Sequence, residues 1–134
     1  MILANELRVG NWIQYNYPRK NTVFNKAKVF EIRNKGVVLK SKGLIKDYQD
    51  YIAFKHDTLK PIPLTEDILL KCGFDKHEYQ YIIEYCINSF KLRYIKKNKK
   101  YVYHTGVRNI EKRYLHQLQN IYLDLEEKEL EVNL

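Results

Sequence analysis

One stretch of the chain, residues 89–113 (SFKLRYIKKNKKYVYHTGVRNIEKR), combines residue types that could bind a nucleic acid. It holds nine Lys or Arg side chains against one acid, Glu111, so its net charge equals the +8 of the whole chain. Aromatic side chains and a histidine lie between the cations: Phe90, Tyr94, Tyr101, Tyr103 and His104. Clustered positive charge attracts phosphates, and flat rings stack on unpaired bases. The stretch therefore predicts a nucleic-acid-binding surface.

The candidate binding residues come from this stretch and from a second basic segment, Asn16 to Lys46. The first set is Lys91, Arg93, Tyr94, Lys96, Lys97, Lys99, Lys100, Tyr101, Tyr103, His104 and Arg108. The second, smaller patch is Arg19, Lys20, Lys26 and Lys28. The alternative is that these cations reflect a lysine-rich composition and bind nothing, because basic patches without a motif are weak evidence.

His104 offers a catalytic alternative. With Tyr101, Tyr103, Arg93 and Arg108 it could form a metal-free ribonuclease site, in which His or Tyr moves the 2′-OH proton and the arginines hold the phosphorane charge. No fixed spacing supports this arrangement, so the sequence favours a binding protein over an enzyme. A third hypothesis is a protein–protein interaction module that docks on an acidic host protein.

No residue pattern indicates a metal or another cofactor. Cys72 and Cys86 follow no metal-ligand spacing, and we expect both thiols to be free and buried. The acids between Glu126 and Glu131 are typical of exposed charge. His116 is expected to hydrogen-bond a backbone carbonyl in the core rather than to act in catalysis.

Length and composition bound the class of protein. The 134 residues, 45% of them apolar, are enough for one compact domain or two small lobes with a core. The N-terminus turns polar within a few residues, and no run approaches the roughly 18 apolar residues of a membrane span. We therefore expect a cytoplasmic protein, either a monomer or a homodimer.

Short alternating segments divided by turn residues fill residues 1–60. The expected strands are Leu7–Tyr15, Thr22–Arg33 and Val37–Leu39, and the expected turns are Gly10-Asn11, Pro18–Asn21 and Asn34–Gly36. This pattern predicts an N-terminal lobe built as a small, bent, SH3-like barrel. Asp47–Lys60 has no clear period and is predicted to be irregular.

Residues 61–134 are predicted to form a second lobe that shares one core with the first. Thr65 is a typical N-cap and Gly73 a typical helix end, so a short helix lies between them. Its buried side is expected to hold Ile68, Leu69, Leu70 and Cys72. Helical spacing predicts a second helix over Tyr114–Leu125.

Between the two helices, three runs of β-forming residues predict an antiparallel meander. They are Tyr79–Cys86, Phe90–Lys96 and Lys100–His104, with Lys96–Lys100 at a hairpin tip. Leu130–Val132 is predicted to add a short edge strand. The predicted class is α+β.

Three segments together resemble a family of small proteins encoded by phages, prophages and mobile elements. They are ELRVGNW (residues 6–12), PIPLTEDILLKCGF (residues 61–74) and LHQLQN (residues 115–120). The resemblance implies a phage accessory protein that handles nucleic acid or blocks host defence, including anti-CRISPR activity. Residues and resemblance together predict a non-catalytic protein of the bacterial cytoplasm that binds RNA or a ribonucleoprotein, such as a CRISPR–Cas effector and its guide RNA.

Overall fold

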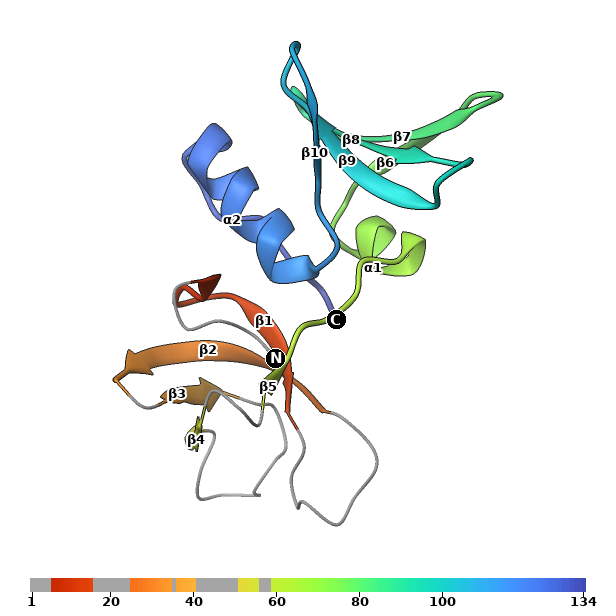
Figure 1. Ribbon diagram of the computed structural model, residues 1–134. Coiled ribbons are helices and arrows are strands. Elements are labelled where there is room, and N and C mark those ends of the chain that lie inside the picture. The colour runs from red at the N-terminus through yellow and green to blue at the C-terminus, as the bar shows by residue number, and fades with distance from the viewer. Residues whose placement is uncertain (1–5, 16–24, 35, 41–50, 56–58) are drawn as a thin grey trace. The chain divides into compact units, whose positions relative to one another are not determined.

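The computed structural model describes residues 6–15, 25–34, 36–40, 51–55 and 59–134. The chain divides into two compact units, unit 1 (Met1–Ile62) and unit 2 (Pro63–Leu134), where the sequence predicted lobes of residues 1–60 and 61–134. Each unit contains one five-stranded antiparallel sheet, and both α-helices of the described residues belong to unit 2 (Figure 1). The predicted α+β class is therefore confirmed.

Unit 1 contains the strands β1 (Trp12–Tyr15), β2 (Asn25–Arg33), β3 (Gly36–Lys40), β4 (Tyr51–Lys55) and β5 (Leu59–Lys60). Their order in the sheet is β4-β3-β2-β1-β5, so within the described residues the sheet is open, with β4 and β5 at its edges. Buried side chains of the sheet, together with Leu7, form the core of the unit: Leu7, Ile13, Tyr15, Ala27, Val29, Val37, Leu39 and Leu59. The prediction that Asp47–Lys60 is irregular was wrong for β4 and β5. These segments lack a clear alternation of apolar and polar residues, but β4 pairs with β3 and β5 pairs with β1.

The expected turn at Gly10-Asn11 is confirmed and leads into β1. Gly10 has a φ of +95°, which glycine adopts without strain. The Asn11 side-chain oxygen accepts a hydrogen bond of 2.8 Å from the Arg8 backbone N–H. The predicted loop Pro18–Asn21, with Arg19 and Lys20, lies outside the described residues, as does Lys35 of the predicted turn between β2 and β3.

Unit 2 is a meander of the strands β6 (Asp75–Glu78), β7 (Ile82–Ile87), β8 (Phe90–Ile95), β9 (Lys100–His104) and β10 (Asn109–Glu111). The sequence predicted three of these strands and missed β6 and β10, which are edge strands with little apolar character. It also placed Tyr79–Tyr81 in a strand. These residues instead form the turn between β6 and β7, which a hydrogen bond of 2.8 Å from Tyr79 N to Ile82 O closes.

The helices α1 (Glu66–Lys71) and α2 (Leu115–Glu126) pack against one face of this sheet. The Thr65 hydroxyl accepts a hydrogen bond from Ile68 N, and Gly73 has a φ of +91°, so the predicted ends of the first helix are confirmed. The prediction that Leu70 is buried was wrong, because its side chain is 48% exposed. Leu130 is buried without forming the predicted edge strand.

Phe90 lies at the centre of the unit 2 core and is 2% exposed. Its ring packs edge-on against Phe74 and Tyr122, with ring centroids 6.1 and 5.2 Å away, and stacks on Tyr103 at 5.2 Å. These contacts join the sheet to α2. Neither helix in the described part of the chain has the length and apolar character that a membrane crossing needs.

Candidate nucleic-acid interface

The sheet of unit 2 has two chemically different faces, which the strand register defines. Residues paired across an antiparallel ladder project to the same side. The helix-covered face carries Ile83, Tyr85, Phe90, Leu92, Tyr94, Tyr101 and Tyr103. The outer face carries Glu84, Lys91, Arg93, Lys100, Val102, His104 and Glu111. The predicted aromatic and cationic binding residues of β8 and β9 therefore lie on opposite sides of the sheet.

The tyrosines of the helix-covered face are occupied by core contacts. Tyr94 and Tyr101 have ring centroids 4.9 Å apart, and Tyr101 also lies 6.1 Å from Tyr85. Burial raises the pKa of Tyr101 to about 12. Together with the stacking of Tyr103 on Phe90, these contacts show why β8 and β9 are rich in tyrosine: the rings fill the space between the sheet and the helices.

Most cations of the outer face are paired with acids. Glu84 is 12% exposed, and its carboxylate lies 3.8 Å from Lys91 Nζ and 3.4 Å from Arg93 Nε. Glu111 accepts a hydrogen bond of 2.9 Å from Arg113 and lies 3.9 Å from Lys100. The hydrogen bond from Arg113 lowers the pKa of Glu111. The net charge of residues 89–113 overstated the charge of this face, because Glu84 lies outside that stretch and pairs with Arg93 across the β7–β8 ladder.

Two turns at one end of the sheet place a segment with two exposed tyrosines next to a segment with four lysines. Lys96 N donates a hydrogen bond of 3.2 Å to Tyr81 O, which joins the β8–β9 turn to the β6–β7 turn (Figure 1). Tyr79 is 55% exposed and Tyr81 73% exposed. We call this group the tip cluster; it consists of Tyr79, Tyr81, Lys96, Lys97, Lys99 and Lys100. No acid among the described residues forms an ion pair with Lys97 or Lys99, and both are exposed.

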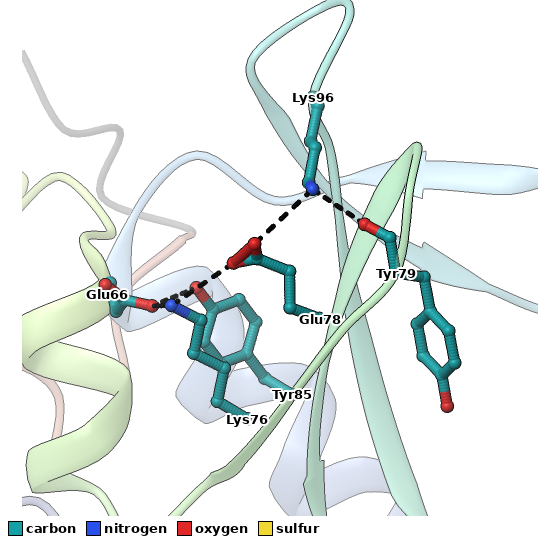
Figure 2. A network of polar contacts seen from close by, with 6 residues as sticks. All are labelled: Glu66, Lys76, Glu78, Tyr79, Tyr85 and Lys96. Carbon is teal, nitrogen blue, oxygen red and sulfur yellow. Dashed lines mark hydrogen bonds and ion pairs between the residues drawn. The ribbon is translucent and has the colours of Figure 1, made fainter.

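A network of polar contacts connects the tip cluster to α1 (Figure 2). Glu66 of α1 lies 2.6 Å from Lys76 Nζ and accepts a hydrogen bond of 3.0 Å from the Tyr85 hydroxyl. Lys76 also lies 3.6 Å from Glu78, which lies 3.6 Å from Lys96. Lys96 Nζ in turn donates a hydrogen bond of 2.6 Å to Tyr79 O. Lys96 thus holds the two turns together, Lys100 lies 3.9 Å from Glu111, and Lys97 and Lys99 are exposed.

The hydrogen bonds to Glu66 change its proton affinity. The pKa of Glu66 is lowered, first by the hydrogen bond from Lys76 and then by the one from Tyr85. The same contact with Glu66 raises the pKa of Lys76, and burial raises the pKa of Tyr85. Both members of the Glu66–Lys76 pair therefore stay charged over a wide range of pH.

His104 and Arg108 lie at the other end of the sheet, by the β9–β10 turn. His104 Nδ1 is 2.8 Å from Asn109 Oδ1, and Arg108 is exposed in a turn held by the Thr105 hydroxyl. Tyr101 and Tyr103 project to the opposite face. The structure therefore does not bring the residues of the ribonuclease hypothesis into one constellation.

The remaining sequence candidates belong to segments other than those of the tip cluster. Lys26 and Lys28 are exposed on β2 of unit 1. Cys72 is buried, which raises the pKa of its thiol to about 11, whereas Cys86 is only half-buried, contrary to expectation. His116 is buried, with its ring 6.0 Å from that of Tyr114. In the described part of the chain, no group of three His, Cys, Asp or Glu residues is placed to hold a metal ion.

Sequence reasoning missed Tyr79 and Tyr81 as candidate functional residues. The signal that could have found them is the segment EYQY (residues 78–81), in which two tyrosines flank a glutamine beside the polar run DKHE. A tyrosine next to a hairpin turn is exposed more readily than one inside a strand that packs against a helix. No family model, curated protein or solved structure matches this chain. The function is therefore inferred from the tip cluster itself.

Proposed function

We propose that the tip cluster binds single-stranded RNA without catalysis. The observation that carries this proposal is the proximity of two exposed tyrosines, Tyr79 and Tyr81, to lysines of the neighbouring turn. Lys97 and Lys99 are exposed and make no ion pair with a described acid, so they can contact phosphates without first losing an internal partner. Stacking of a base on an aromatic side chain contributes about 1–3 kcal/mol.

The position of the rings favours a single strand over a duplex. Tyr79 and Tyr81 project from a hairpin turn, and a ring can stack on a base only where the base has left its own stack. The choice of RNA follows from the resemblance of the sequence to phage accessory proteins. In that setting the specific target we propose is the guide RNA of a CRISPR–Cas effector, with the protein acting as an inhibitor in the bacterial cytoplasm.

Fluorescence anisotropy with a labelled single-stranded RNA of about twelve nucleotides tests the proposal, since single-strand sites span roughly 4–16 nucleotides. Tyr79→Ala combined with Tyr81→Ala should weaken binding by about tenfold or more, because one to two stacked rings are lost. Tyr79→Phe combined with Tyr81→Phe is the matched control, since it keeps both rings and should bind as the unmodified protein does. Equal affinity for the alanine variant and the unmodified protein would contradict the proposal.

We also propose an SH3-like architecture for unit 1. The strand order β5-β1-β2-β3-β4 and the shift of register in β2 between Val29 and Glu31 support it, because such a bulge bends a long strand so that its two halves can join two sheets. A crystal structure in which the two halves of β2 belong to sheets packed across each other would agree with this proposal. A single flat sheet would not.

A further inference from the structure

Lys96 contacts the backbone of both tyrosines of the tip cluster. Its backbone N–H donates a hydrogen bond of 3.2 Å to Tyr81 O, and its Nζ donates one of 2.6 Å to Tyr79 O. Figure 2 shows the second of these contacts, with the Tyr79 ring directed away from the Lys96 ammonium group. One residue of the β8–β9 turn therefore holds the carbonyls on both sides of Gln80, at the point where the two exposed rings leave the chain.

The surroundings of Lys96 differ from those of Lys97 and Lys99 in the same turn. The Lys96 side chain is 35% exposed, and its Nζ lies 3.6 Å from the Glu78 carboxylate as well as within hydrogen-bond distance of Tyr79 O. Lys97 and Lys99 are both exposed. If the Lys96 ammonium group moved to a phosphate, it would have to give up a carbonyl and a carboxylate that it already contacts. Contact with a phosphate is therefore less favourable for Lys96 than for its two neighbours.

Glu78 is itself held by a second lysine. Its carboxylate lies 3.6 Å from Lys76 Nζ, and Lys76 Nζ lies 2.6 Å from Glu66 of α1. Acidic and basic side chains thus alternate from α1 to the turn, so each charge has a neighbour of opposite sign (Figure 2). The network connects Lys96, through Glu78 and Lys76, to a helix that packs on the core of unit 2.

We infer that Lys96 is a positioning residue of the RNA site: it fixes the turn that carries Tyr79 and Tyr81 in the free protein and does not itself contact a phosphate. A turn that is already ordered loses less conformational entropy when bases stack on its rings, so binding is stronger. The inference rests on the proposed function, because it concerns the same site. It gives Lys96 a role different from the direct contact with nucleic acid that its place in a basic run predicted.

Anisotropy with a single-stranded RNA of about twelve nucleotides separates positioning from phosphate contact. Lys96→Gln should weaken binding about fivefold, because the turn must then become ordered on binding, and should leave the slope of log affinity against log salt within about 0.2 of the unmodified value. A lost phosphate contact would instead reduce the slope by about 0.7. Lys91→Gln is the matched control, because it removes the same charge from the same hairpin. Each lysine lies beside a glutamate, at 3.8 Å for Lys91 and 3.6 Å for Lys96, and the control should weaken binding less than about twofold.

Two further measurements separate positioning of the turn from a general loss of stability. In a protein that already carries Tyr79→Ala and Tyr81→Ala, Lys96→Gln should have little further effect on binding, because no rings remain to be positioned. In the free protein, the Tyr79 amide donates the hydrogen bond to Ile82 O that closes the turn, so it should exchange with solvent faster in Lys96→Gln. The Leu118 amide, which donates to Tyr114 O in α2, is the control and should exchange at an unchanged rate.

The outcomes distinguish this inference from the proposed function. A slope reduced by about 0.7 in Lys96→Gln would overturn the positioning role. An equal loss of affinity with and without the two tyrosines, or unchanged exchange of the Tyr79 amide, would overturn it as well. Each of these results leaves the proposed function in place if Tyr79→Ala/Tyr81→Ala weakens RNA binding. RNA binding that does not depend on the two tyrosines would refute the proposed function and this inference together.

Discussion

Two pairs of cations in the same hairpin should contribute very differently to RNA binding. Lys97 and Lys99 lie in the turn between β8 and β9 and are exposed, whereas Lys91 and Arg93 lie on β8 beside Glu84. The variants Lys97→Gln/Lys99→Gln and Lys91→Gln/Arg93→Gln each remove two positive charges from the chain. They are therefore matched in net charge and differ only in the surroundings of the lost cations.

The expected magnitudes follow from counterion release. A phosphate contact that contributes about 0.7 to the salt slope of a single strand strengthens binding about fivefold at about 0.1 M salt, relative to 1 M. Loss of Lys97 and Lys99 should therefore weaken binding about 25-fold, or about 1.9 kcal/mol. Loss of Lys91 and Arg93 should weaken it less than about threefold, because both lie beside Glu84, whose carboxylate offsets one of their two charges and competes with a phosphate for both cations.

The assay is anisotropy at several salt concentrations between about 0.05 and 0.2 M, from which the slope of log affinity against log salt is obtained. The slope should fall by about 1.4 for Lys97→Gln/Lys99→Gln and stay within about 0.3 of the unmodified value for Lys91→Gln/Arg93→Gln. Urea unfolding of both variants provides the folding control, since the second removes the two cations that lie beside Glu84. Equal losses of affinity for the two variants would refute the reasoning that cross-strand acids select the usable cations.

Three further predictions concern the stability of unit 2. Phe90→Ala should lower the free energy of unfolding measured in urea by about 3–5 kcal/mol, because it empties a site lined by three rings, whereas Val107→Ala at a 92% exposed position should change it by less than about 0.5 kcal/mol. Glu66→Gln should make the free energy of unfolding depend less on pH in the acid range. The pKa of Glu66 is lowered in the folded state, so its carboxylate stabilises the fold at pH values above its ordinary pKa of 4.5. That stabilisation is lost as the pH falls below this value. A series of unfolding curves at decreasing pH measures this, and an acid limb unchanged by Glu66→Gln would contradict it. Burial raises the pKa of Cys72 to about 11, so Cys72 should react with a disulfide reagent at pH 8 only after unfolding, and Cys86 should react first. Equal reaction rates of the two thiols in the folded protein would contradict this prediction.

The sequence predicted best those elements whose signals are local. The ends of α1 depend on the Thr65 hydroxyl and on the backbone freedom of Gly73, and both act within a few residues of the helix. The strand β8 shows a clear alternation of apolar and polar residues over its first half, with Phe90 and Leu92 buried and Lys91 exposed between them. Patterns of this kind survive in the folded protein because tertiary contacts reinforce them.

The features that sequence reasoning missed depend on partners that are distant in the sequence. The strand β6 (DKHE) is exposed along its whole length, so only its pairing with β7 identifies it. Arg93 meets Glu84 across the β7–β8 ladder, and a charge count over a window of residues does not include such a partner. The tip cluster has the same origin, because Tyr81 and Lys96 become neighbours only once β7 and β8 have paired in register.

The strand order of unit 2 has a consequence for its folding kinetics. Each strand from β6 to β10 pairs with its successor, so nearly all of the ladder forms by closing short loops, which is typical of fast folding. One contact of unit 2 instead joins residues that are distant in the sequence. Pro63 and Tyr114 form an isolated antiparallel β-bridge, and Leu64 N donates a hydrogen bond of 2.9 Å to Arg113 O; we call this contact the seam. We expect the hairpins to nucleate first and this seam to close last, so that contacts form in the order of their separation along the chain.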